Sequence, residues 1–175
     1  MVHVKRFLVI FISLVLSYVL QMLVLPKIPY LITVPNLLLA ETLSIGFLYG
    51  RGLGLLTGVI SGLLLDIMGI GVPGFYTLIL AWLGFLDGLL SEKMESELIF
   101  ALFLLLLLNE AVYHGYILLL GFLVNVRFSF IPYIKEVFAP EVLLTMVCFL
   151  FSYGILIFVS KRWNLRVNRG EVKVV

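Results

Sequence analysis

The sequence has few charged residues and a single cysteine. Charged side chains make up 13% of the 175 residues, about half of the roughly 25% that is usual for soluble domains. Because Cys148 stands alone, an internal disulfide and a cysteine zinc cluster are excluded. Hydrophobic residues make up 63%, more than a soluble domain of this size can bury. These proportions exclude a disordered chain, a secreted disulfide scaffold and a soluble enzyme core, and they predict that lipid surrounds most of the chain.

The sequence also lacks the common catalytic motifs. No serine or cysteine nucleophile stands beside a histidine, and the HExxH, phosphate-loop and paired-cysteine patterns are missing. The carboxylates are scattered over different predicted helices. We therefore expect a protein that is not an enzyme and that has no cofactor and no metal. An intramembrane enzyme stays open as an alternative that no motif supports.

The chain does contain a series of long apolar runs. A bilayer core of roughly 30 Å needs about 20 apolar residues per helix, so about six spans fit. The first run is too long for a signal peptide and is followed by no small-x-small cleavage site, which favours a retained anchor. Pro35 suits the first turn of the second span. We predict one all-α transmembrane domain over residues 1–175, a compact bundle with spans at about residues 7–25, 35–50, 53–68, 75–90, 98–124 and 140–160.

Lysine and arginine are distributed unequally between the predicted ends of these spans. With a cytoplasmic amino terminus, nine of the twelve lie inside and three outside. The inside set is Lys5, Arg6, Arg51, Lys93, Lys161, Arg162, Arg166, Arg169 and Lys173, and the outside set is Lys27, Arg127 and Lys135. The positive-inside rule therefore predicts that both termini are cytoplasmic. The basic tail, residues 161–175, is expected to anchor on anionic lipid rather than to bind nucleic acid.

Glycine recurs at every fourth residue through the second and third spans. The series is Gly46, Gly50, Gly54, Gly58 and Gly62, with Asp66 next on the same ridge, and Gly84 and Gly88 repeat the spacing on the fourth span. A ridge without side chains lets another helix approach closely. Internal packing is the favoured interpretation, and a face for a partner helix from another subunit stays open.

Ionisable residues at membrane depth are costly, so each needs an explanation. Glu41 lies about two turns into the second span, and Asp66 and Asp87 lie near span ends, where we expect water to reach them. Glu110 and His114 are four residues apart on one face of the fifth span. Interhelical hydrogen bonding is favoured for them, and a proton or ion pathway stays open. A metal site is disfavoured, because two ligands are insufficient and no second histidine falls within the membrane.

One segment of the chain, residues 35–74, resembles a known family. It contains Pro35 and Asn36 before three leucines, and then the run Gly-Val-Ile-Ser-Gly-Leu-Leu-Leu-Asp over residues 58–66. A turn with Gly69, Gly71, Pro73 and Gly74 follows. This pattern resembles the MreD family of rod shape-determining membrane proteins. The family usually has proline–aspartate where this chain has proline–asparagine.

The resemblance implies a non-enzymatic scaffold in the bacterial cytoplasmic membrane. MreD-like proteins bind the bitopic protein MreC and are linked through it to MreB, to RodA and to its penicillin-binding transpeptidase, and so to peptidoglycan synthesis and rod shape. The family fold is similar to the S components of energy-coupling-factor vitamin transporters. That similarity supplies the alternative function, a small-molecule uptake module with a cavity lined by groups such as Asn36 or Asp66.

Three sets of residues are candidates for the partner contact. They are the glycine ridges, the pair Pro35 and Asn36, and the aromatic segment with Phe128, Phe130 and Tyr133, which we expect to lie in a loop over residues 125–139. Aromatic side chains favour the membrane–water interface. Lipid anchoring is therefore the favoured role of that loop, and partner binding is the second.

Overall fold

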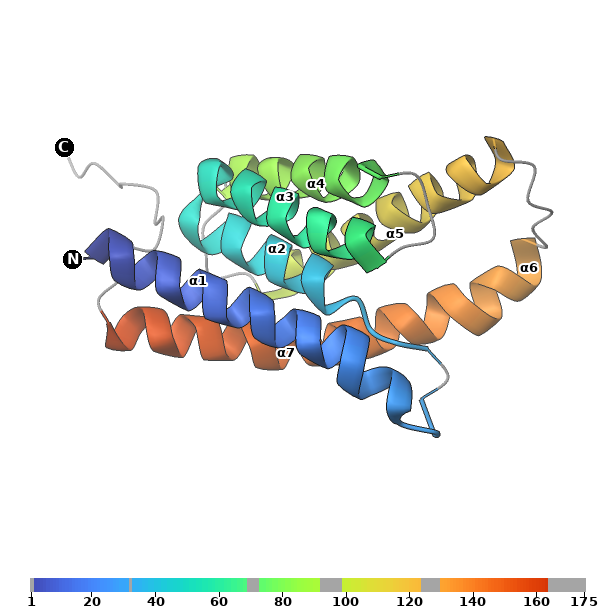
Figure 1. Cartoon of the computed structure of the whole chain (residues 1–175), viewed down its shortest axis with the longest axis horizontal. Coiled ribbons are helices and arrows are strands. Elements are labelled where there is room, and N and C mark those ends of the chain that lie inside the picture. Colours follow the sequence, from blue (N-terminus) through green and yellow to red (C-terminus); the bar gives the residue numbers. More distant parts are fainter. Residues whose placement is uncertain (1, 32, 69–72, 92–98, 124–129, 164–175) are drawn as a thin grey trace.

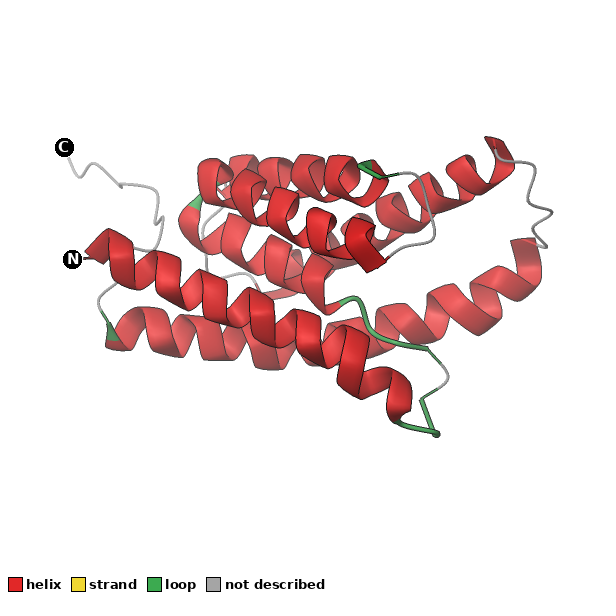
Figure 2. Cartoon of the chain, viewed as in Figure 1, coloured by secondary structure: helices red, strands yellow, loops and turns green. Residues whose placement is uncertain are grey.

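The computed structural model describes residues 2–31, 33–68, 73–91, 99–123 and 130–163. Every regular element in these ranges is a helix (Figure 2). The α-helices are α1 (Val2–Val19), α2 (Leu37–Tyr49), α3 (Arg51–Met68), α4 (Phe75–Ser91), α5 (Ile99–Leu123), α6 (Phe130–Tyr133) and α7 (Ala139–Arg162). Two π-helical turns, η1 (Leu20–Val24) and η3 (Ile134–Phe138), and the 3-10 turn η2 (Leu25–Lys27) extend α1 and join α6 to α7. The all-α prediction is confirmed for this part of the chain.

Among the described residues, three helices are long and apolar enough to cross a membrane, which indicates a membrane protein. They cover Val4–Lys27, Phe100–Leu119 and Ile131–Arg162. The helices α2 and α4 are apolar but shorter, with 13 and 17 residues. At 1.5 Å per residue, α2 is only about 20 Å long. The bundle therefore combines long helices with short ones that lie among them.

The short helix α2 lies at the centre of the bundle, in contact with α1, α3, α4, α5 and α7 (Figure 1). All 13 of its residues are buried. A helix that is apolar on every side is stable only when neighbours cover it all round. The sequence of α2 fits this position, because apolar residues occupy every face and the hydroxyls of Thr42 and Ser44 bond to carbonyls of the same helix. Glu41 is the one acid of α2 and is buried with it.

The glycine ridges of α3 and α4 face each other. A Cβ atom on Gly54 would lie 2.1 Å from the carbonyl oxygen of Gly84, and one on Gly58 would lie 2.1 Å from that of Leu80. The same is true of the remaining ridge glycines, Gly62 and Gly88, whose added Cβ atoms would lie 2.2 and 2.3 Å from facing backbone. The two backbones are thus in contact along both helices. The internal-packing interpretation is confirmed, and no room is left on these ridges for a partner helix.

The turn between α2 and α3 is a single residue, Gly50, with φ of +89°. A residue with a side chain is strained at this angle, so glycine permits the sharp reversal. The reversal brings α3 back along α2, where Gly54 of α3 lies against Gly46 of α2. Gly46 also packs against Gly84 of α4. This hairpin sets the register in which α4 meets both helices.

The predicted loop over residues 125–139 is wrong for residues 130–139, which are helical and continuous with α7. The prediction rested on the aromatic residues, which favour the membrane–water interface, and on Pro140 as the first residue of the last span. Both π-helical turns lie just before a proline, Pro26 after η1 and Pro140 after η3. A proline inside an α-helix removes one hydrogen bond and crowds the carbonyl four residues earlier. In η3 the Ala139 amide donates to the Ile134 carbonyl five residues earlier, and the helix continues through Pro140 into α7. After η1 the helix ends within the 3-10 turn that contains Pro26.

The amino end of α1 and the carboxyl ends of α2 and α7 meet at one end of the bundle (Figure 1). The Arg6 guanidinium lies 5.0 Å from the centre of the Tyr49 ring, and the Tyr49 hydroxyl is 2.5 Å from that of Ser160. Of the basic residues described, Lys5 and Arg6 lie near the amino end of α1, Arg51 at the start of α3, and Lys161 and Arg162 at the carboxyl end of α7, whereas Lys27 lies in η2 and Lys135 in η3. The remaining basic residues of the sequence-based count lie outside the described ranges.

Candidate functional site

Polar groups from three elements meet at the amino terminus of α2. The Asn36 side chain accepts a hydrogen bond from the Leu39 amide at 3.3 Å, and the Gln21 side chain of η1 accepts one from the Leu38 amide at 2.9 Å. The backbone amide of Asn36 donates to the Thr145 hydroxyl of α7 at 2.9 Å. The first amides of a helix have no partner within it. Here η1 and α7 help to satisfy them, and this joins α1 and α7 to the central helix.

The second span therefore begins at Leu37 rather than at Pro35, and Asn36 is its N-cap. Asparagine and aspartate are equally good at this position. The departure from the proline–aspartate pattern thus keeps the capping function. Because Asn36 is 2% exposed and bonded on two sides, it lies inside the bundle rather than on a partner surface.

We expect Asn36→Ala to lower the free energy of unfolding by about 1 kcal/mol, because the buried Leu39 amide loses its acceptor. Asn36→Ser is the matched control, since serine is a comparable N-cap and should retain most of the stability. Thermal unfolding of the detergent-solubilised variants measures both effects. Equal melting temperatures for the two variants would contradict the capping role.

Asp66, near the carboxyl end of α3, caps the amino end of the next helix, α4. Its carboxylate accepts hydrogen bonds from the amides of Tyr76 and Thr77, each at 3.1 Å, and from the Thr77 hydroxyl. Gly74, with φ of +97°, lies in the turn that precedes these amides. The acid that ends the Gly-Leu-Leu-Leu-Asp run thus holds the carboxyl end of α3 against the amino end of α4.

Two further buried carboxylates lie among the helices. Asp87 of α4 accepts a hydrogen bond from Asn109 of α5 at 2.8 Å and is 1% exposed. The expectation that water reaches Asp87 is therefore wrong, because α5 covers it. Glu41 of α2 is also 1% exposed, and its Oε2 atom has no hydrogen-bond partner among the described residues.

The largest group of titratable side chains lies between α5 and α7. His114 Nε2 is 3.4 Å from Glu110 Oε2 and 3.6 Å from Glu141 Oε1. His114 Nδ1 is 2.8 Å from the Tyr133 hydroxyl of α6. We call Glu110, His114 and Glu141 the carboxylate–histidine cluster. It brings Glu141 of α7 next to two residues of α5, Glu110 and His114, which lie 31 and 27 positions earlier in the sequence.

Aromatic rings fix the imidazole of His114 in place. The rings of Tyr113, Tyr133 and Phe138 lie edge-on to it, with centroids 5.5, 5.9 and 5.1 Å away. Edge-to-face contact is a preferred arrangement for aromatic pairs. Tyr133 therefore contacts His114 of α5 and does not belong to a free aromatic loop. Of the other two residues proposed for that loop, Phe130 begins α6, and Phe128 lies outside the described residues.

The sequence-based interpretation of the fifth span was correct in part. An interhelical hydrogen bond is confirmed for His114, and the nearby Asn109 also makes one, to Asp87. Neither carboxylate oxygen of Glu110, however, has a hydrogen-bond partner in the described part of the chain. Sequence reasoning did not identify Glu141, which follows Pro140 at the predicted start of the last span. Its position as the first acid of an otherwise apolar helix was the signal that could have identified it.

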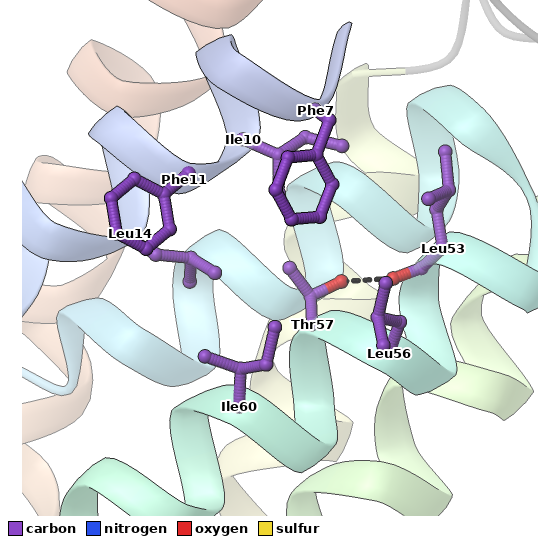
Figure 3. A pocket seen from close by; sticks show the side chains of 8 residues that line it. All are labelled: Phe7, Ile10, Phe11, Leu14, Leu53, Leu56, Thr57 and Ile60. Carbon is purple, nitrogen blue, oxygen red and sulfur yellow. Dashed lines mark hydrogen bonds between the residues drawn. The ribbon is translucent and has the colours of Figure 1, made fainter. Parts of the chain in front are cut away.

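An apolar crevice lies on the other side of the bundle, between α1 and α3 (Figure 3). Its lining consists of Phe7, Ile10, Phe11 and Leu14 from α1 and Leu53, Leu56, Thr57 and Ile60 from α3. The Thr57 hydroxyl donates to the carbonyl of Leu53 in its own helix. The crevice therefore offers hydrocarbon contacts, of the kind that a lipid chain or an apolar side chain makes.

The polar contacts of the described residues include two helix caps, the Asp87–Asn109 and Tyr49–Ser160 bonds, and the carboxylate–histidine cluster. The caps and the bonds hold helices together, whereas the cluster contains Glu110, neither of whose carboxylate oxygens has a hydrogen-bond partner within the described ranges. In comparisons with known proteins, no family model, no curated protein and no solved structure matches this chain.

Proposed function

We propose that this chain is a membrane scaffold of the MreD type, a subunit of the bacterial cell-elongation machinery. In this proposal it lies in the cytoplasmic membrane, binds a bitopic partner of the MreC type, and takes part in the control of peptidoglycan synthesis and rod shape. The observation that carries the proposal is that the segment resembling the MreD family supplies the residues that hold three helices together. Asn36, the ridge glycines and Asp66 are the residues on which the packing of α2, α3 and α4 depends. This supports a shared fold, and the function follows by analogy.

The proposed topology has six spans with both termini in the cytoplasm. The short helices α2, α3 and α4 then cross a bilayer that is locally thin, or that is replaced around them by the longer helices. The basic residues at the end that holds both α1 and α7 termini support this orientation, because cytoplasmic ends attract lysine and arginine.

The alternative uptake function requires polar groups that are free to meet a small molecule. Ligand pockets place a few convergent polar groups in a mostly apolar cavity. The two residues named for that role, Asn36 and Asp66, instead bond to backbone amides of this chain. The crevice between α1 and α3 is lined by hydrocarbon and by the internally bonded Thr57. These contacts favour the scaffold.

The proposal is tested by co-expressing the tagged chain with the MreC protein of the same genome and purifying it from solubilised membranes. We expect the two proteins to elute together in a constant ratio. Failure to co-purify, recovery of a transporter ATPase module, or a stoichiometric vitamin in native mass spectrometry would each overturn the proposal. Gly58→Leu does not map the interface, because this glycine packs inside the protein.

Photo-crosslinking locates the partner in the same experiment. One crosslinker replaces Phe11, which is 54% exposed at the rim of the crevice, and a second replaces Phe100, which is 78% exposed on α5. Both positions are apolar and lipid-accessible, so each is a matched control for the other. A crosslink to MreC from one position and not from the other identifies the covered face, and lipid adducts alone from both would count against a complex.

A further inference from the structure

We propose that the carboxylate–histidine cluster is a binding site for a divalent transition-metal ion of the zinc class. Its protein ligands are Glu110, His114 and Glu141. The site goes beyond the scaffold function and does not depend on it. The sequence offered only two ligands on one helix face, and the packing of α7 against α5 supplies the third.

The separation of the ligand atoms fits a metal ion. His114 Nε2 is 3.4 and 3.6 Å from the two carboxylate oxygens, and all three ligand atoms lie within 4.8 Å of one another. Charge-assisted hydrogen bonds are shorter, at about 2.7–2.9 Å. A tetrahedral ion with nitrogen and oxygen ligands at about 2.0–2.1 Å separates neighbouring ligand atoms by about 3.3–3.4 Å. The cluster is therefore spaced for a shared ion rather than for direct hydrogen bonds.

The burial of Glu110 supplies an independent indication of a ligand. Its side chain is 0% exposed, neither of its oxygens has a hydrogen bond within the described ranges, and its one ionic neighbour there is His114 Nε2 at 3.4 Å. A buried carboxylate is retained only when it is paired or coordinates a metal. Glu141 adds a second carboxylate with a side chain that is 15% exposed. With a neutral imidazole the cluster has a charge of about −2, which a divalent ion balances.

The contacts of His114 suit a ligand whose Nε2 atom faces the ion. Its Nδ1 atom is 2.8 Å from the Tyr133 hydroxyl, and edge-on rings hold the imidazole in place. When Nδ1 bears the proton and donates to Tyr133, the lone pair of Nε2 points toward the two carboxylates. Metal-binding histidines regularly use their second nitrogen for such an orienting hydrogen bond.

The ligand set selects the kind of ion. Imidazole nitrogen favours zinc and its neighbours in the first transition series, whereas magnesium and calcium prefer oxygen ligands alone. Three protein ligands leave a fourth position for water. The partial exposure of Glu141, near the start of α7, gives the ion a path of entry.

The first experiment measures metal in the unaltered protein. The detergent-purified chain is stripped with a chelator, exposed to Zn²⁺, passed over a desalting column and analysed by elemental mass spectrometry. We expect one zinc ion per chain, and with Co²⁺ we expect the visible absorption of a four-coordinate site. Less than about a tenth of one ion per chain would overturn the proposal and leave the cluster as a histidinium between two carboxylates.

Variants then assign the ion to these side chains. Glu110→Gln, His114→Gln and Glu141→Gln should each lose stoichiometric zinc. Glu41→Gln is the matched control, because Glu41 is equally buried but lies on α2 and is not among the three ligands. Retention of zinc by all three ligand variants would overturn the assignment. Gel filtration checks that each variant is folded, and Glu141→Gln, at the least buried position of the three, decides the matter if the others aggregate.

The role of Tyr133 as a positioning residue is tested by Tyr133→Phe. This change keeps the ring but removes the hydroxyl that orients His114. We expect zinc affinity to fall about 10–100-fold, the usual effect of removing such a partner, while one ion per chain still binds at saturation. An unchanged affinity in a competition titration with a zinc chelator would contradict the orientation of the imidazole.

Discussion

The Gly58→Ala protein is expected to lose about 3 kcal/mol of its free energy of unfolding, near the upper end of the usual cost of overpacking. The added methyl would lie 2.1 Å from the carbonyl oxygen of Leu80 and 2.8 Å from the Cα of Ala81. Both atoms belong to the backbone of α4, so no side-chain rotation relieves the clash. The two helices have to separate, and contacts along the whole α3–α4 interface weaken together.

Gly115→Ala is the matched control for this experiment. Gly115 also lies within a helix, but an added Cβ meets none of the described atoms within 4 Å. This variant should be as stable as the original chain or more stable by up to about 1 kcal/mol, because alanine favours helix. Unfolding in mixed micelles by titration with a denaturing detergent measures both. Similar stability of the two variants would show that α3 and α4 do not pack through bare backbone.

Asp66→Ala should have the second largest effect, a loss of about 2 kcal/mol in the free energy of unfolding. The substitution leaves the amides of Tyr76 and Thr77 without their acceptor, and it removes a negative charge from the amino end of α4. The turn between α3 and α4 loses its fixed end as well. The same micelle titration measures the loss.

Two milder changes separate the parts of this cap. Asp66→Asn keeps one acceptor oxygen and should lose about half as much, whereas Thr77→Val removes only the hydroxyl and should cost about 1 kcal/mol. Glu136→Ala is the control for loss of an exposed acid and should have little effect. If Asp66→Ala were as stable as Glu136→Ala, the acid would not hold the two helices together.

The helices were predictable because their signal is local. Each apolar run predicted from hydropathy lies in a helix, and the four-residue glycine spacing predicted close packing that the structure confirms. The extension of α7 back to residue 130 was not predictable in this way. Pro140 suits the start of a helix, and the π turn η3 before it lets the helix continue back to residue 130, with Pro132 in the first turn of α6.

The cluster between α5 and α7 could not be predicted in full from the sequence, since its parts come from separate helices. Glu110 and His114 were identified by their spacing on one helix face, whereas the approach of Glu141 depends on how α7 packs. The same applies to Gln21, which caps α2 from a π turn seventeen positions before Leu38. Periodicity describes one helix at a time, and contacts between helices follow from shapes that it does not contain.

The burial of α2 determines the order in which the protein can assemble. A helix of 13 residues is shorter than the about 20 needed to cross a bilayer, and α2 also has the acid Glu41 in its second turn. On its own it would expose that carboxylate to lipid, so it is stable only between α1, α3, α4 and α7. We therefore expect α2 to reach its buried position only after the helices that cover it have been made.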